Sequence, residues 1–242
     1  MTVNTAISTW FTVAVLLSFS VDWIAVGLNW YKIKFVTKPL AMLMVILWTM
    51  INADWGISAM VGVLLLAQLL GLSGDVFLIL PNTFFLYGLL AFLLGHVFYV
   101  VLVILIFTKV DQISVIVKQV VWGVLLGLLV WGIAMALFYY VFRSLSHPGA
   151  ITRKFWAAIQ VYGWILSSTG AFVVFLVFAL GDFTCEIVLL PAGTFLFWLS
   201  DTLLAVNKFL KPIPNGQLWV RISYHFAQFS LAAGFLSLIV PS

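Results

Sequence analysis

Eight long runs of apolar residues constrain this chain more than any other feature of its sequence. An α-helix needs about 20 predominantly apolar residues to cross the hydrocarbon core of a bilayer. The runs place spanning helices at roughly 6–28, 37–53, 57–80, 83–107, 116–142, 154–180, 186–207 and 218–240. Strands of a membrane barrel would be about ten residues long and alternate in polarity, and these runs do not. The sequence therefore predicts an all-α, polytopic membrane helix bundle with about eight transmembrane helices.

The composition excludes a water-soluble fold. Only 7% of the 242 residues are charged, whereas a soluble domain carries about 25%. No basic tail is present, so we expect no nucleic-acid partner. The single cysteine, Cys185, excludes an internal disulfide. No connecting segment is long enough to separate domains, so residues 1–242 are predicted to form a single transmembrane domain.

Lysine and arginine are distributed unevenly among the loops, and this distribution predicts the orientation. Only Lys109 and Lys118 lie beside an even-numbered loop. The other basic residues lie in or beside odd-numbered loops: Lys32, Lys34, Lys38, Arg143, Arg153, Lys154, Lys208, Lys211 and Arg221. Basic loops stay on the cytoplasmic side. We therefore expect the odd loops to be cytoplasmic and both termini to lie on the non-cytoplasmic side.

Two aspartates inside the predicted spans require a reason, because an aspartate at a helix centre costs about 2.5–3.5 kcal/mol on insertion scales. Asp75 and Asp201 each precede the cytoplasmic end of their span by about five or six residues, which is roughly 8–9 Å at 1.5 Å per residue. Other polar side chains lie in the same half or near the midplane: Lys38, His96, Tyr99, Tyr162, Asn207, Tyr224 and Gln228. The sequence predicts a polar cavity in the cytoplasmic half of the bundle.

Of two carboxyl groups in one low-dielectric site, one can stay protonated and act as a general acid while the other stays charged and acts as a base. Glycosidases use such a pair to protonate an acetal oxygen and stabilise an oxocarbenium ion. A membrane enzyme could treat a lipid ether in the same way. The chain has no Gly-x-Ser-x-Gly elbow and no His-Glu-x-x-His motif. We expect no metal or cofactor, with one metal on Asp75, Asp201 and His96 as a weaker alternative.

Five short motifs, taken in order, resemble those of the YhhN-like family, which includes lysoplasmalogenases. The motifs are Lys38-Pro39, Gly74-Asp75, Gly95-His96-x-x-Tyr99, Ser200-Asp201-x-x-Leu204-Ala205-x-Asn207-x-Phe209, and Tyr224-x-x-Ala227-Gln228. The resemblance implies eight spans and hydrolysis of the vinyl ether bond of lysoplasmalogens. The products would be a fatty aldehyde and glycerophosphocholine or glycerophosphoethanolamine. It also implies that Asp75 and Asp201 are the catalytic pair, and we favour Asp75 as the acid because Gly74 permits close helix approach.

The polar neighbours are expected to orient the aspartates, the water or the glycerol. Lys38 stands where a phosphate head group would lie, although it could equally be a lysine that only sets topology. Arg221 poses the same choice between a phosphate contact and a topology-setting role, and we favour the topology-setting role. Asp22 either supports the site from the first span or pairs locally, and His225 is given no role.

Two other classes of function remain open. Paired intramembrane aspartates also form proton relays, so a proton-coupled transporter is one alternative. A bundle that binds lysolipid without cleaving it is the other. The expected partners are a lysophospholipid substrate and bilayer lipid. The host membrane would be the cytoplasmic membrane in a bacterium, or the endoplasmic reticulum or a similar membrane in a eukaryote.

Overall fold

The computed structural model of the chain describes residues 3–30, 32–109, 117–143 and 153–240. The elements are α1 (Val3–Gly27), α2 (Lys34–Asn52), α3 (Ala59–Ile79), η1 (Asn82–Phe84), α4 (Phe85–Lys109), α5 (Val117–Phe142), α6 (Arg153–Leu180), α7 (Cys185–Ala205), η3 (Val206–Leu210) and α8 (Gly216–Ile239). Within the described residues, eight helices are long and apolar enough to cross a membrane. The predicted all-α, eight-span bundle is confirmed, with helix ends within about three residues of the predicted ones.

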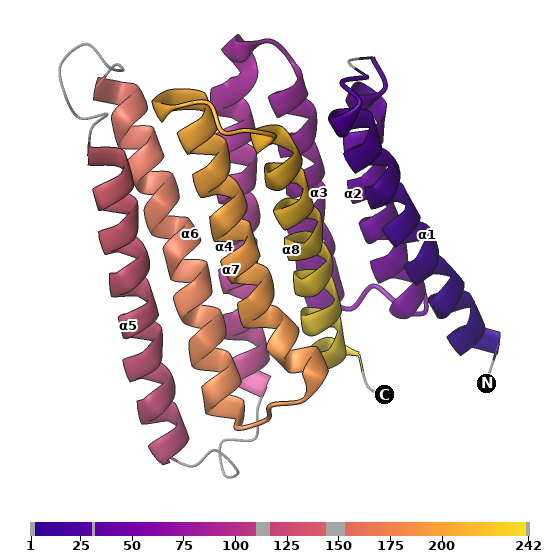
Figure 1. Cartoon of the computed structure of the whole chain (residues 1–242). Coiled ribbons are helices and arrows are strands. Elements are labelled where there is room, and N and C mark those ends of the chain that lie inside the picture. The colour runs from indigo at the N-terminus through magenta and orange to yellow at the C-terminus, as the bar shows by residue number, and fades with distance from the viewer. Residues whose placement is uncertain (1–2, 31, 110–116, 144–152, 241–242) are drawn as a thin grey trace.

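Consecutive helices form four hairpins, α1–α2, α3–α4, α5–α6 and α7–α8, as Figure 1 shows. In each hairpin the first helix ends and the second begins at the same end of the bundle, which we call the hairpin end. Helix α1 begins and α8 ends at the opposite end, which we call the terminal end. Helix α8 packs against α7, α2, α1 and α3, whereas α5 lies at the edge and packs chiefly against α6. The centre of the molecule is therefore built around α8.

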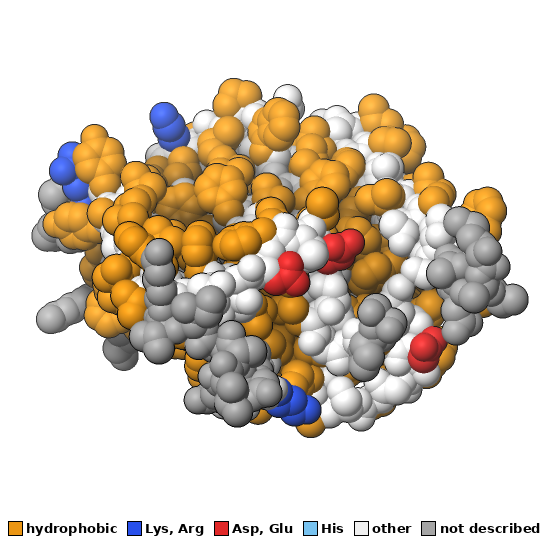
Figure 2. Space-filling model, turned by 90° about the horizontal axis from the view of Figure 1, so that it is seen from below, with side chains coloured by type: hydrophobic (Ala, Val, Ile, Leu, Met, Phe, Trp, Pro, Cys, Tyr) orange, Lys and Arg blue, Asp and Glu red, His pale blue; other side chains and the backbone are white. Residues whose placement is uncertain are grey.

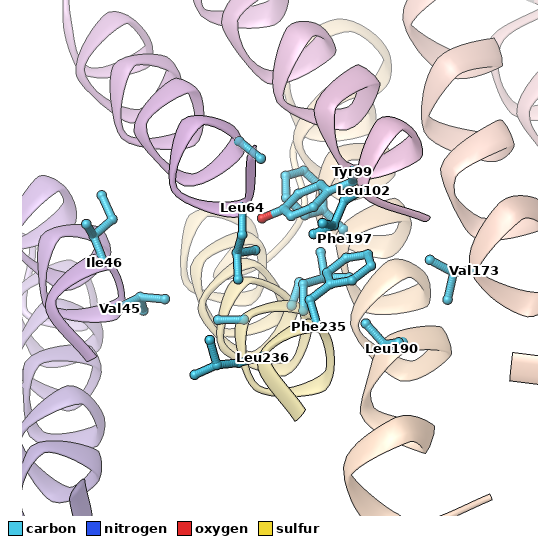
Figure 3. Close-up of a cluster of buried hydrophobic side chains, with 14 of the residues drawn as sticks. Val45, Ile46, Leu64, Tyr99, Leu102, Val173, Leu190, Phe197, Phe235 and Leu236 are labelled. Carbon is cyan, nitrogen blue, oxygen red and sulfur yellow. The ribbon is translucent and has the colours of Figure 1, made fainter. Parts of the chain in front are cut away.

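An apolar core fills the half of the bundle nearer the terminal end (Figure 3). Leu64, Leu102, Leu190 and Phe235 come from α3, α4, α7 and α8, and all four are fully buried. The ring of Tyr99 stacks on that of Phe235, with centroids 5.6 Å apart. Because this half is packed with apolar side chains, the main buried charges lie toward the hairpin end.

Exposed acidic side chains mark the terminal end. Figure 2 views this end and shows a surface of mainly hydrophobic side chains and backbone with few charges. Asp54 lies in the α2–α3 connection, and Asp182 and Glu186 lie where α6 leads into α7. Exposed Lys32 and Lys211 lie in the connections of the hairpin end. Exposed Lys109, at the end of α4, is a basic residue at the terminal end. Acidic side chains therefore predominate at the terminal end and basic ones at the hairpin end, while the side of the membrane that each end faces stays a prediction.

The α7–α8 connection has a defined shape that positions the site. Helix α7 runs into the π-helical turn η3, where the N–H of Lys211 bonds to the carbonyl of Val206 at 3.0 Å. The Oδ1 atom of Asn207 then accepts the N–H of Ile213 at 2.8 Å. Asn215 has a positive φ of 52°, a conformation that asparagine tolerates, and α8 begins at the next residue. The turn thus brings the end of α7 back against the start of α8.

Candidate functional site

Asp75 lies near the hairpin end of α3 and is fully buried. The Nζ atom of Lys38, from α2, lies 2.8 Å from its Oδ1 atom. The hydroxyl of Tyr224, from α8, donates to its Oδ2 atom at 2.9 Å. Taking a carboxylate out of water is costly unless it is paired and hydrogen-bonded. Both oxygens of Asp75 therefore have a polar neighbour, each supplied by a different helix.

A chain of hydrogen bonds extends from Asp75 toward the middle of the bundle. Tyr99 donates its hydroxyl to Gln228 Oε1 at 3.0 Å. Gln228 Nε2 in turn donates to the Tyr224 hydroxyl at 3.2 Å. Every donor in the chain points toward Asp75, so the bonds polarise one another and stabilise negative charge on its carboxylate. A Cβ atom on Gly71 would lie 2.9 Å from Gln228 Nε2, so glycine at this position makes room for the chain.

Asp201 lies one turn before the end of α7 and has a different environment. The hydroxyl of Tyr162, from α6, donates to its Oδ2 atom. Both residues line a narrow slot whose other walls are almost entirely apolar, including Phe92 and Phe138. The slot has a free volume of about 30 Å³, which is room for one or two water molecules. Asp201 therefore borders an apolar space, while Asp75 is enclosed by polar groups.

The two aspartates belong to one electrostatic cluster. The charges of Lys38 and Asp75 both act on Asp201, although the three residues come from three helices. Asp75 and Asp201 also lie at the same end of the bundle, as the counts along their spans predicted. The structure thus brings together two carboxylates that are far apart in the sequence.

A second, larger cavity of about 450 Å³ opens beside the slot at the hairpin end. Its walls come from α2, α3, η1, α4, α7, η3 and α8, and they include Lys38, Lys208 and Arg221. Three apolar residues are shared by this cavity and the slot: Leu78, Phe85 and Leu204. An apolar space that contains a carboxyl group therefore adjoins a wider space lined by cations.

His96 and Asn207, two of the predicted supporting residues, lie outside the hydrogen-bond chain that ends at Asp75. The His96 ring is buried against Phe197, with centroids 4.4 Å apart, and neither ring nitrogen has a hydrogen-bond partner among the described residues. It lies beside Tyr99 and Tyr162, whose ring centroids are 5.9 and 6.4 Å away. Asn207 lines the larger cavity, but its side chain oxygen serves the backbone of the α7–α8 turn. Across the described part of the chain, no three His, Cys, Asp or Glu side chains converge.

Asp22 and Arg221 form a buried ion pair that was not predicted from the sequence. Asp22, from α1, is fully buried, and its Oδ1 atom accepts from the Arg221 guanidinium and from Thr37 Oγ1 at 2.6 Å. His225 is buried beside this pair, with Nε2 3.8 Å from the Asp22 carboxylate and Nδ1 accepting from Trp23 at 3.1 Å. The sequence contained one indication of this pair. Each residue is a charge inside a largely apolar span, and a buried charge requires a partner.

Comparison with known proteins gives one family. No curated protein and no solved structure matches the chain significantly. The model of the YhhN family matches residues 33–235, which contain α2 to α7 entirely and most of α8. Both aspartates and their polar neighbours lie within the matched residues, whereas α1, which carries Asp22, lies outside them. The match covers most of the chain, and the protein therefore belongs to the YhhN family.

Proposed function

We propose that this protein hydrolyses the vinyl ether bond of lysoplasmalogens, as expected from its family. One observation carries the proposal: the apolar slot that contains Asp201 adjoins the cation-lined cavity beside Asp75. A lysoplasmalogen has an alkenyl chain at one end, a phosphate at the other and the vinyl ether between them. It would place its chain in the slot, its phosphate in the cavity and its reacting bond near the junction. Because the free volume of the slot is small, the chain enters only when the slot side chains move apart.

Asp201 is the residue that we assign to proton transfer. It borders the slot, whereas Asp75 carries the negative charge that pairs with Lys38. The proton of Asp201 goes to the β-carbon of the vinyl ether, and the π electrons form the new C–H bond. This step leaves an oxocarbenium ion. The assignment reverses the expectation from the sequence, which favoured Asp75 as the acid because of Gly74.

Water completes the reaction. Its oxygen bonds to the cationic carbon while Asp201, now a carboxylate, takes one of its protons and is restored. The resulting hemiacetal breaks its bond to the glycerol oxygen, and its hydroxyl proton moves to that oxygen. The fatty aldehyde and the glycerophosphodiester then leave. Asp75 remains charged throughout, stabilises the cationic intermediate electrostatically and holds Lys38 in place.

An aldehyde assay on the purified full chain in detergent tests the proposal. Asp201→Asn should lower kcat about 10²- to 10⁴-fold, the range of general acid catalysis, and Asp75→Asn should also lower it strongly. Asp182→Asn is the matched control, because Asp182 is exposed at the terminal end and asparagine keeps its bond to the Thr184 N–H. Full activity in Asp201→Asn would remove that residue from the mechanism.

Deuterium oxide tests the first step. Protonation of the β-carbon from solvent-exchanged Asp201 places one deuterium at carbon 2 of the aldehyde, which is trapped at once as a hydrazone for mass spectrometry. The saturated alkyl ether has no double bond to protonate, so it should bind and stay intact. An aldehyde without solvent deuterium would contradict the proposed chemistry.

The two other classes of function give different results. A lysolipid-binding protein would bind both ethers and release no aldehyde from either. A proton-coupled transporter would release no aldehyde and would drive solute counterflow in liposomes.

A further inference from the structure

The three cations of the larger cavity differ in their partners. Lys38 is paired with Asp75, and Arg221 is paired with Asp22. Lys208 contacts only neutral groups among the described residues: its Nζ atom donates to Asn82 Oδ1 at 2.7 Å and lies 4.3 Å from the Phe85 ring centroid. None of the described residues that line the cavity is acidic. The charge of Lys208 is therefore not balanced within the cavity.

Arg221 remains able to bind an anion despite its pairing. A guanidinium has five N–H donors in a fixed fork, and the pairing with Asp22 engages Nη1. Arg221 is almost fully buried yet lines the cavity. Asp22 is held in turn by the Thr37 hydroxyl at 2.6 Å, so the carboxylate behind Arg221 is fixed. Asp22 itself does not line the cavity, so a guanidinium paired with this fixed carboxylate keeps a constant orientation.

The start of α8 adds to the positive potential of the cavity. Helix α8 begins at Gly216, and Gln217 in its first turn lines the cavity wall. The N-terminal end of a helix carries a partial positive charge and attracts anions. Two cationic side chains and this helix end therefore act on the same space, which lies at the hairpin end beside the apolar slot.

We propose that this cavity binds the phosphate of the lysophospholipid through Lys208 and Arg221, and that Asp22 of α1 is a positioning residue for Arg221. The identity of the lipid rests on the proposed function, whereas the recognition of a phosphate rests on the cavity itself. Lys38 stays with Asp75. Because no acidic side chain is among the described residues that line the cavity, the ammonium of a choline or ethanolamine head group has no negatively charged partner among them, so the phosphate carries the recognition.

Calorimetric binding to the full chain in detergent tests the phosphate site without any cleavage. The probes are a saturated 1-O-alkyl lysophosphocholine, the matching 1-O-alkylglycerol without phosphate, and inorganic phosphate. We expect the lysolipid to bind at least tenfold more tightly than the alkylglycerol. Lys208→Gln and Arg221→Gln should each weaken lysolipid binding about tenfold or more, as for lost charge-assisted bonds, and leave alkylglycerol binding unchanged.

The same variants separate the possible sources of phosphate. Inorganic phosphate that binds as tightly as the lysolipid, with the same losses in the variants, would assign the cavity to free phosphate and overturn the head-group assignment. Equal binding of lysolipid and alkylglycerol would overturn the phosphate site itself. A preference for the lysolipid that both variants abolish supports the proposal.

The role of Asp22 must be tested with a measurement that a general loss of stability would not change, and the separate effects on KM and kcat provide one. Asp22→Asn should raise KM for lysoplasmalogen as Arg221→Gln does, keep kcat within about twofold, and leave the hydrolysis of alkenylglycerol unchanged. Asp22→Glu should restore part of the lost affinity. Ser8→Ala is the matched control, because it removes a different α1–α2 bond, to Asn52 at 2.6 Å, near the terminal end. Equal losses for both lipids would make Asp22 merely structural.

Asp22→Asn leaves Arg221 as an unpaired buried charge and could therefore fail to fold. A variant without either charge covers this case. The double variant Asp22→Asn, Arg221→Gln removes both charges and should fold while showing the same binding defect as Arg221→Gln alone, because Asp22 acts only through Arg221. A further loss of lysolipid binding in the double variant would contradict this role of Asp22. In the unaltered protein, tighter binding of the lysolipid than of the alkylglycerol, with no aldehyde released from lysoplasmalogen, would support this site and remove the proposed hydrolysis. Equal hydrolysis of lysoplasmalogen and alkenylglycerol would support hydrolysis and remove this site.

Discussion

Tyr224 is the residue through which the polar groups around Asp75 are joined. It donates to the Asp75 carboxylate and accepts from Gln228. The Nζ atom of Lys38 also lies 5.4 Å from its ring centroid, within the range of a cation–π contact. Phe92 packs edge-on against the same ring, at 5.7 Å. A single side chain thus fixes the carboxylate, its cation and the start of the hydrogen-bond chain.

Tyr224→Phe removes the hydroxyl and keeps the ring. A hydrogen bond to a charged group is worth about 1.5–3 kcal/mol, so kcat for aldehyde release should fall about ten- to a hundredfold. Tyr99→Phe, at the far end of the chain, should have a smaller effect because its bond reaches Asp75 only through Gln228. Kinetics of the two variants measure the difference. A larger loss in Tyr99→Phe would mean that the chain does not serve Asp75.

Gly71→Ala tests the space that the hydrogen-bond chain needs. The new methyl group would lie 2.9 Å from Gln228 Nε2, so the amide must move and its bond to Tyr224 weakens. We expect a lower kcat with little loss of thermal stability, since the displaced atom is the end of a flexible side chain. Gly62→Ala is a control on the same helix, where the nearest atom lies 3.7 Å away. Unchanged kcat in Gly71→Ala would show that the chain tolerates this displacement.

The depth of a buried residue could be predicted from the sequence, but its partners could not. Asp75 and Asp201 were assigned to one level because depth follows from counting residues along a span. The Asp22–Arg221 pair joins residues that are 199 positions apart. In a soluble helix the apolar stripe shows which side faces inward. A membrane helix is apolar on all sides because lipid is as apolar as the core, so the sequence gives little indication of which faces meet.

At the scale of elements, η3 and the turn after it determine where Lys208 lies. The apolar pattern predicted the end of the seventh span near residue 207, but nothing in that pattern indicates a π-helical turn. The bond from the Ile213 N–H to Asn207 closes the turn. A Cβ atom on Gly216 would lie 2.7 Å from Asn207 Oδ1, so the start of α8 packs tightly against this side chain. Asn207 therefore supports the cavity through the backbone.

Asn207→Ala should lower the free energy of unfolding by about 1 kcal/mol, since it leaves the Ile213 N–H without its acceptor. It should also raise KM, because Lys208 lies in the loosened turn. Asn207→Asp keeps an acceptor and is expected to keep the stability, while its negative charge opposes an anion in the cavity. Thermal unfolding and KM, measured together, separate the two effects. An unchanged melting temperature in Asn207→Ala would contradict the structural role of this bond.

At the scale of the whole molecule, the two ends of the bundle differ in charge, and this difference makes the orientation testable. Cys185 is the one cysteine of the sequence, and it is exposed at the start of α7, at the terminal end. If this end is non-cytoplasmic, a membrane-impermeant maleimide should label Cys185 in intact cells. The variant Cys185→Ser, Lys211→Cys moves the thiol to the hairpin end and should react only after permeabilisation. The reverse pattern would invert the predicted topology.

The junction of the slot and the cavity also bears on how products leave. In the proposed reaction, the bond that breaks lies between an apolar space and a cation-lined one. The aldehyde would be released on the apolar side and dissolve in the surrounding lipid, while the glycerophosphodiester would be released on the polar side and diffuse into water. The two fragments would then be in different phases and seldom meet again in the site. Hydrolysis would accordingly run in one direction, with little inhibition by either product.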